Sequence, residues 1–257
     1  MRPQVILMQH WTDSHTTNAP LLCHSLPVTP GLHADLLDRL GRLLAGGEVP
    51  PGTVLRAEEL AARYGVSRTV VREAVRVLES MGMVRSRRRI GTVVVEPARW
   101  NVFDPMVIRW RLAGPGRDDQ LRSLSELRAG FEPVAAGLAA RRATPAQCGA
   151  LTAAVVDMAV HGRSGDLAAY LAADVVFHRT LLEATGNEML AALADVVAEV
   201  LAGRTHHGLM PATPNPDAIR LHADVAEAVR GGDADAARGA MQAILAEAAD
   251  AMLEPRT

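Results

Sequence analysis

Three arginines at intervals of four residues form the most informative chemical pattern in this sequence. Arg68, Arg72 and Arg76 recur about once per helical turn, so they would line one outward face of a helix. Guanidinium groups neutralise phosphates and donate paired hydrogen bonds to guanine edges in the major groove of DNA. The pattern indicates a DNA-contacting ridge, and a solvated helix face without a partner is the alternative.

A second pattern could bind a metal ion. Asp174 and His178 are four residues apart and share one face of a predicted helix, and His222 lies in a later helix. One carboxylate and two imidazoles suit zinc, nickel or manganese. Such spacing is often incidental, and a buried histidine bonded to a backbone carbonyl is the ordinary alternative.

The segments around the arginines predict a helix-turn-helix. A short helix beginning near Leu55 would end at Gly65, which readily adopts a left-handed conformation, and Ser67 can cap the helix that follows. On that second helix an apolar stripe would face the core. It consists of Val71, Ala74, Val75 and Leu78.

A charged hairpin follows the second helix. Met83–Ser86 and Thr92–Val95 predict two short strands with β-branched content, separated by the tip Arg87–Gly91. A helix-turn-helix followed by such a hairpin is a winged helix-turn-helix. This context favours duplex DNA as the partner of the arginine ridge over a merely solvated face.

Four separated stretches of this region resemble the N-terminal domain of GntR-type transcription regulators. They are Gly47–Leu55, Ser67–Ala74, Gly82–Val84 and Gly91–Val94, and the resemblance covers roughly residues 30–97. In that family the arginines matching Arg68 and Arg72 contact the operator, as does the wing. We therefore predict a set of DNA-binding residues: Arg56, Arg68, Thr69, Arg72, Arg76, Arg88 and Gly91.

Charge is distributed unevenly along the chain. Residues 56–99 hold ten Arg and five acidic residues, a net of +5, whereas residues 118–257 hold eleven Arg and nineteen acidic residues, a net of −8. The formal net charge of −2 therefore conceals a basic head and an acidic body. This asymmetry is typical of a DNA-reading domain attached to a second domain with another task.

The second half of the sequence predicts an all-α bundle. Beyond Asp118 we find signals for six or seven helices and none for a strand. Thr144 and Gln147 form a predicted capping box, with Pro145 in the first turn. The predicted helices span residues 118–142, 144–162, 166–185, 188–204, 217–230 and 233–253.

This half is similar to the FCD effector domain of the FadR subfamily of GntR regulators. The resemblance rests on Glu126–Arg128 with Glu132, then Asp174 with Phe177-His178, and then His222 with Gly232-Asp233. It implies that Asp174, His178 and His222 bind a divalent metal, zinc in the first place and nickel or manganese otherwise. The fourth family ligand, a histidine, would fall at or near Ile244, so three protein ligands would leave open positions on the metal.

The resemblance also implies where a small acid would bind. Arg128 matches the family arginine that meets the carboxylate of the effector, and an intrahelical pair with Glu132 is its alternative role. Arg204 and His206 are further candidates beside the effector pocket. For His206 and the adjacent His207, cations at a helix end are the alternative.

One aromatic-rich segment and one polar segment set the remaining domain boundaries. Trp100, Phe103 and Trp110 lie in residues 98–117, and a polar tether would not carry them, so we expect this linker to dock. Its pattern resembles the linker of galactonate-responsive regulators of the family. Residues 1–28 lack periodicity, which predicts a flexible tail or a start codon assigned too early. This leaves residues 29–97 as the DNA-binding domain and residues 118–257 as the effector-binding and dimerisation domain.

Composition is consistent with a two-domain helical protein of 257 residues. Hydrophobic residues make up 49% of the chain but aromatic residues only 3%, so the cores must be built from Ala, Leu and Val, which suits packed helices. Cys23 and Cys148 are too few for a disulfide framework. No apolar run approaches membrane length, and we expect a cytoplasmic protein without a membrane partner.

Together these patterns predict a transcription regulator, a repressor, that is not an enzyme. A homodimer would match a palindromic operator. The family resemblance implies that a small carboxylate such as an aldonate would control its affinity for DNA. A metal-dependent enzyme with an ancillary DNA-binding domain is one alternative, although no nucleophile motif or Gly-rich phosphate loop supports it. A DNA-binding protein without any ligand is the other.

Overall fold

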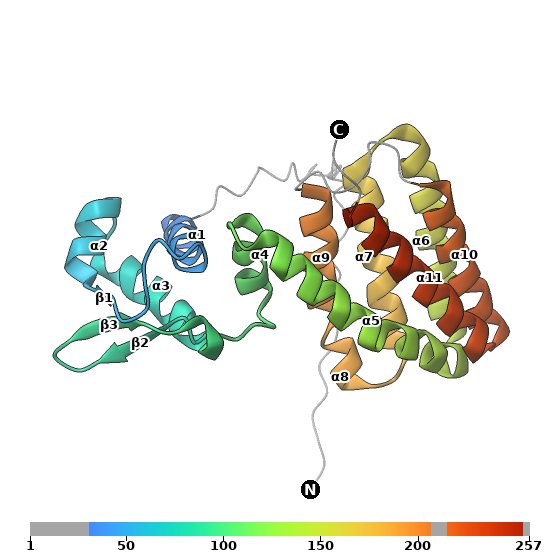
Figure 1. The fold of residues 1–257 in the computed structure, drawn as a ribbon, viewed down its shortest axis with the longest axis horizontal. Helices are drawn as coiled ribbons and strands as arrows, with labels where there is room; N and C mark the ends of the chain where they lie inside the picture. The colour runs from blue at the N-terminus through green and yellow to red at the C-terminus, as the bar shows by residue number, and fades with distance from the viewer. Residues whose placement is uncertain (1–30, 207–214, 254–257) are drawn as a thin grey trace, which may run out of the picture.

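The computed structural model describes residues 31–206 and 215–253 of the chain. It has a smaller N-terminal part and a larger helical bundle, with one helix between them (Figure 1). This mainly helical architecture with a small sheet confirms the predicted fold class. The predicted tail, residues 1–28, and His207 lie outside the described ranges.

The N-terminal part is a winged helix-turn-helix. Its helices are α1 (Leu32–Ala45), α2 (Ala57–Tyr64) and α3 (Arg68–Ser80), and its strands are β1 (Val54–Leu55), β2 (Val84–Arg87) and β3 (Gly91–Val94). Gly65 ends α2 with a φ of 65°, a left-handed conformation that suits glycine. The hydroxyl of Ser67 accepts a hydrogen bond from the Val70 backbone N–H at 3.3 Å, which caps α3 as the sequence predicts.

The wing is a three-stranded antiparallel sheet in the order β1-β3-β2. In the hairpin Val84 pairs with Val94 and Arg87 pairs with Gly91, which fixes the register of the charged tip. Strand β1, which pairs Val54 with Val93, was not anticipated because two residues carry too little periodicity to reveal a strand.

The linker contains the short helix η1 (Pro97–Arg99) and the helix α4 (Pro105–Ala113). Trp100 is buried and its Nε1 donates to the Val95 carbonyl at 2.9 Å. Trp110 is also buried, and its Nε1 donates to Asp38 Oδ1 at 2.8 Å. Phe103, which we expected to dock with them, is 50% exposed; it lies in the turn before α4, where no described core covers it.

Helix α4 is apolar on two faces and joins two cores. Val107 and Trp110 belong to the core of the N-terminal part. Ile108 and Leu112 belong to a different core, formed with residues of the first and fifth bundle helices. A helix buried on both sides in this way couples the positions of the parts it joins.

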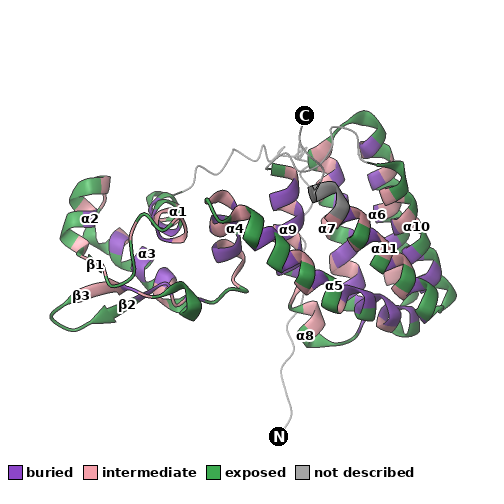
Figure 2. Cartoon of the chain, in the orientation of Figure 1, coloured by how far each residue is buried: buried purple, intermediate pink, exposed green. Residues whose placement is uncertain are grey.

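The C-terminal part is an all-α bundle, and in the described residues it has seven helices, within the predicted six to seven. They are α5 (Arg117–Arg142), α6 (Pro145–Ser164), α7 (Leu167–Ala184), α8 (Glu188–Ala191), α9 (Ala194–His206), α10 (Pro216–Gly231) and α11 (Ala234–Leu253). Buried positions face neighbouring helices and exposed positions face outward (Figure 2). The capping box of Thr144 and Gln147 is formed at the start of α6.

One predicted helix is wrong as a continuous element. Residues 188–204 form α8 and α9 with a turn between them, where the Leu193 N–H bonds to the Leu190 carbonyl, three residues back, at 3.1 Å. This three-residue hydrogen bond interrupts the α-helix. The break contains no glycine or proline from which the sequence could have predicted it. Among the helices of the described ranges, none combines the length and apolarity needed to cross a membrane.

Candidate functional site

Helix α3 presents two different faces. Val71, Ala74 and Leu78 are fully enclosed in the N-terminal core, which orients the opposite side of the helix outward. That side carries the exposed residues Arg68, Thr69, Arg72 and Arg76. Packing of the apolar stripe therefore determines the direction of the arginine ridge.

The arginines of this ridge make only exposed ion pairs. Arg68 Nη1 lies 3.4 Å from Glu58 Oε1, and Arg76 Nη1 lies 2.6 Å from Glu73 Oε1. Arg56 is paired in the same way with Glu59 at 3.0 Å. Exposed pairs of this kind contribute little to stability, so DNA phosphates can replace the acidic partners. Arg72 makes no ion pair with any described residue.

The wing lies beside this ridge. A shallow groove between α2, α3 and the hairpin is lined by five arginines: Arg56, Arg72, Arg76, Arg87 and Arg89. Gly91 also lines the groove, whereas Arg88 is exposed at the tip. From the tip the sequence predicted Arg88 and Gly91 and missed Arg87 and Arg89, because charge alone does not show which side chains of a turn face the groove.

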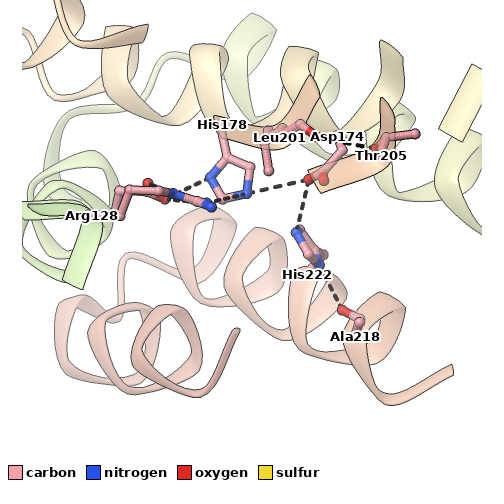
Figure 3. A network of polar contacts seen from close by, with 8 residues as sticks. Arg128, Asp174, His178, Leu201, Thr205, Ala218 and His222 are labelled. Carbon is pink, nitrogen blue, oxygen red and sulfur yellow. Dashed lines mark hydrogen bonds and ion pairs between the residues drawn. The ribbon is translucent and has the colours of Figure 1, made fainter. Parts of the chain in front are cut away.

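Within the described residues a second cluster lies inside the bundle, where Asp174 and His178 on α7 face His222 on α10 (Figure 3). All three residues are buried, and their ligand atoms lie within 4.8 Å of one another. His178 Nε2 lies 3.4 Å and His222 Nε2 lies 3.3 Å from Asp174 Oδ1. Helical spacing placed the first two residues together, and the packing of α10 brings in the third.

The outer nitrogen of each imidazole lies close to an acceptor oxygen. His178 Nδ1 lies 2.8 Å from Glu132 Oε2, and His222 Nδ1 lies 2.6 Å from the Ala218 carbonyl. With a proton on each Nδ1, both Nε2 atoms present lone pairs toward Asp174, as second-shell partners of metal-binding histidines do. Asp174 Oδ1, His178 Nδ1 and His222 Nε2 are enclosed, and none of the three makes a hydrogen bond of good geometry with a described residue. Two imidazoles and one carboxylate oriented in this way fit a divalent cation.

Arg128 and Glu132 on α5 form the wall next to His178. Arg128 Nε lies 2.5 Å from Glu132 Oε1, so the intrahelical pair considered as the alternative role of Arg128 is formed, and both residues are buried. Arg128 Nη2 also lies 3.4 Å from His178 Nε2, at the edge of the cluster. Burial raises the pKa of Glu132, but Arg128 and His178 outweigh it and lower the pKa to about 2.

The other acid of the cluster is likewise ionised. Burial raises the pKa of Asp174, but the close approach of the His178 and His222 imidazoles outweighs this and holds the pKa well below its ordinary value. Sequence analysis missed the contact of Glu132 with His178, since four-residue spacing to Arg128 accounted for Glu132 on its own.

The remaining candidates lie on α9 and α11. Arg204 is buried on α9, and its Nε has no hydrogen-bond partner among the described residues. Burial and the nearby charge of Arg128 lower the pKa of Arg204. His206 is exposed in the last turn of α9. Ile244 of α11 is buried within the apolar core of the bundle, where it offers no metal ligand.

Comparison with known proteins agrees with both parts of the structure. Residues 32–94 match the gntR family of bacterial regulatory proteins, and residues 123–247 match the FCD domain. The HTH-type transcriptional regulator YieP of Escherichia coli (strain K12) is 31% identical over 229 residues, which cover 88% of this chain and 97% of YieP. The chain belongs to the GntR family and carries an FCD domain. As expected, this GntR-family protein is a DNA-binding transcription regulator and not an enzyme.

Other relatives of this GntR-family protein are similar over most of their length. The galactonate operon transcriptional repressor of E. coli (strain K12) is 28% identical over 209 residues, covering 80% of this chain and 90% of the repressor. Lar, which controls expression of the Listeria monocytogenes agr system, has the same fold with a TM-score of 0.55 at 22% identity, covering 87% of this chain and 98% of Lar. E. coli McbR/YncC also shares the fold, with a TM-score of 0.52 at 18% identity over 87% of this chain and 98% of that protein.

Proposed function

We propose that this regulator is a repressor whose operator affinity is controlled by a small hydroxy carboxylate, bound together with a divalent metal inside the helical bundle. In this assignment residues 29–97 bind DNA, residues 98–117 transmit the signal and residues 118–257 bind the effector and form a homodimer. Two-fold symmetry of the dimer would match a palindromic operator.

The observation that carries the proposal is the buried cluster of Asp174, His178 and His222 with enclosed polar atoms that lack partners. Buried polar groups without partners are costly, and they are common only where a ligand or ion completes the site. Zinc held by these three residues would supply Lewis-acid positions for the carboxylate and α-hydroxyl oxygens of an acid. Nickel and manganese suit the same donors.

An aldonate is the class of acid we favour. Arg128 lies beside the cluster with His178, and arginine binds a carboxylate through paired, charge-assisted hydrogen bonds. The similarity to the galactonate operon repressor supports a sugar acid over other acids. We also assign an effector contact to His206, which is exposed in the last turn of α9.

Helix α4 offers a continuous route from the pocket to the DNA-binding helices. A Cβ on Gly203, next to Arg204, would lie 2.6 Å from Leu112 Cδ1, so α9 and α4 are in close contact there. A Cβ on Gly41 of α1 would lie 2.3 Å from the Trp110 ring. A shift of α9 on ligand binding would therefore displace α4 and then α1, which packs against α3.

Thermal denaturation with a panel of acids tests the proposal. The zinc-loaded protein should gain several degrees in Tm with galactonate, gluconate or lactate, and EDTA should abolish the gain. If a fatty acyl-CoA raised the Tm and the hydroxy acids did not, the assignment of a hydroxy carboxylate as effector would be wrong. Equal responses with and without EDTA would overturn the metal assignment.

A further inference from the structure

Arg204 carries a positive charge that no acidic residue of 31–206 and 215–249 neutralises through an ion pair. Arg204 is only 8% exposed, its Nε is enclosed without a hydrogen-bond partner, and it forms no ion pair with any residue of these two ranges. Arginine stays protonated in proteins, so burial alone does not remove this charge. A buried guanidinium without a partner is unusual, because desolvation of the charge is costly.

The neighbouring acids are already engaged. Glu132 is paired with Arg128, and Asp174 faces the two histidines. Glu247 of α11 is the other carboxylate whose charge acts on Arg204, but it is partly exposed and its Oε1 accepts a hydrogen bond from Asn215 at 3.2 Å. None of the three can provide the close, paired oxygens that a guanidinium binds.

A charge balance of the buried cluster of Arg128, Glu132, Asp174 and Arg204 shows which charge would be uncompensated with a metal bound. Arg128 and Glu132 cancel, which leaves Asp174 and Arg204 as the charged groups of the buried cluster. A divalent ion on Asp174, His178 and His222 would raise the net charge of this enclosed volume to +2. A monoanionic acid would compensate half of that charge, whereas a dianion would compensate all of it.

We propose that the effector carries two anionic groups, an α-hydroxy carboxylate for the metal and Arg128, and a second carboxylate or phosphate that Arg204 binds. This inference rests on the metal-bound hydroxy carboxylate of the proposed function. Among hydroxy acids it favours hydroxy dicarboxylates and phosphorylated sugar acids over a monoanionic aldonate. The planar fork of Arg204 bonds two oxygens of either group at once. Arg204 thus selects the effector by charge, while the metal cluster recognises the hydroxy acid common to all candidates.

Matched pairs of acids test this selection by isothermal titration calorimetry on the zinc-loaded full chain. The pairs are galactonate with galactarate, lactate with malate, and gluconate with 6-phosphogluconate. Galactarate and malate, which are dianions, and 6-phosphogluconate, which carries close to three negative charges at pH 7, should each bind at least tenfold more tightly than the matched monoanion. The carboxylate pairs and the phosphate pair together show which second group Arg204 prefers.

Arg204→Gln is the decisive variant. It should reduce the affinity for dianions to that for monoanions, leave monoanion affinity within about twofold, and leave zinc stoichiometry unchanged. In the absence of acids this variant should be as stable as the native protein or more so, because an uncompensated buried charge is gone. If the role of Arg204 were purely structural, Arg204→Gln would be less stable than the native protein in the absence of acids. Arg204→Lys, which keeps the charge without the fork, should retain part of the preference.

Two outcomes overturn the inference in different ways. If the native protein binds galactonate and galactarate equally, or if Arg204→Gln loses the same affinity for both, Arg204 does not select a dianionic effector. The proposed function would still stand in that case. If none of the six acids binds the zinc-loaded protein, the proposed function fails and this inference fails with it.

Discussion

Arg72 is the residue at which the DNA-binding surface is simplest to test. It lies in the groove between α3 and the wing and has no acidic partner among the described residues. Its side chain is therefore available to DNA without first breaking an ion pair, unlike Arg68 and Arg76.

Replacing Arg72 by alanine should weaken operator binding by at least tenfold, which corresponds to about 1.4 kcal/mol. Fluorescence anisotropy with an operator selected from random duplexes would measure the loss. Arg230→Ala, which removes an exposed ion-paired arginine from α10, should have no effect. Equal affinities of the Arg72 and Arg230 variants would argue against the α3 surface as the DNA contact.

His178 is the corresponding residue of the metal cluster. His178→Ala should abolish high-affinity zinc binding and with it the loss of Tm that EDTA causes in the native protein, because two remaining ligands cannot retain the ion. His161→Ala on α6, outside the cluster, should retain one zinc per chain by atomic absorption. DNA affinity without acid should be the same in both variants. Full zinc occupancy in His178→Ala would exclude this site.

The residues of the site differ in how far sequence could predict them. Asp174 and His178 follow from helical spacing, whereas the approach of His222 depends on how α10 packs. The contact of Glu132 with His178 and the isolation of Arg204 depend on distances between helices. Whether a charged side chain forms an ion pair with a residue of another helix depends on the tertiary structure and cannot be predicted from the sequence pattern.

At the scale of elements, α4 determines how the two parts communicate. Its aromatic residues signalled a docked segment, but its helical form was not predicted, because a helix buried on two faces lacks a single apolar stripe. The break between α8 and α9 was missed for a related reason, since Ala192 and Leu193 are good helix formers. The winged helix-turn-helix was predictable because caps, turn residues and strand patterns all agreed.

Leu112→Ala should uncouple the parts. Leu112 is almost fully buried against Gly203, so its truncation should lower the free energy of unfolding by about 2–5 kcal/mol. It should also reduce the effect of the acid on operator affinity at least threefold, while affinity without acid is retained. Anisotropy titrations with and without acid give both values.

Leu151→Ala is the matched control for this experiment. Leu151 is fully buried in the bundle core away from α4, so its loss should destabilise the protein to a similar extent yet leave the coupling intact. Equal coupling in the two variants would show that α4 does not transmit the signal.

The contact between Asp38 and Trp110 predicts a pH dependence. Burial raises the pKa of Asp38, but hydrogen bonds from Arg42 and Trp110 outweigh it, so the folded pKa is below the ordinary aspartate value of 3.8. The carboxylate therefore stabilises the folded state above pH 3.8, and this contribution is lost as the pH falls through the folded pKa. Native protein should exceed Asp38→Asn in urea-unfolding free energy at pH 7, and the difference should shrink at pH 3. A difference independent of pH would contradict this assignment.

The whole molecule combines a basic DNA-reading part with an acidic bundle that holds the proposed effector pocket. Each phosphate neutralised by an arginine releases counterions, so operator affinity should depend steeply on salt. The two parts contact each other through α4, which packs against α1, α5 and α9. A ligand in the bundle can therefore alter DNA binding only if this contact has two arrangements of different energy.

The most direct test of this account compares operator affinity with and without the acid in native protein and in Asp174→Asn. Zinc-loaded native protein should change its Kd at least tenfold on saturation with acid, about 1.4 kcal/mol of coupling. Asp174→Asn should bind the same DNA with unchanged affinity and no response to the acid. A native protein indifferent to every acid of the panel, or a variant that responds as the native protein does, would contradict control of the DNA-binding part from the metal cluster.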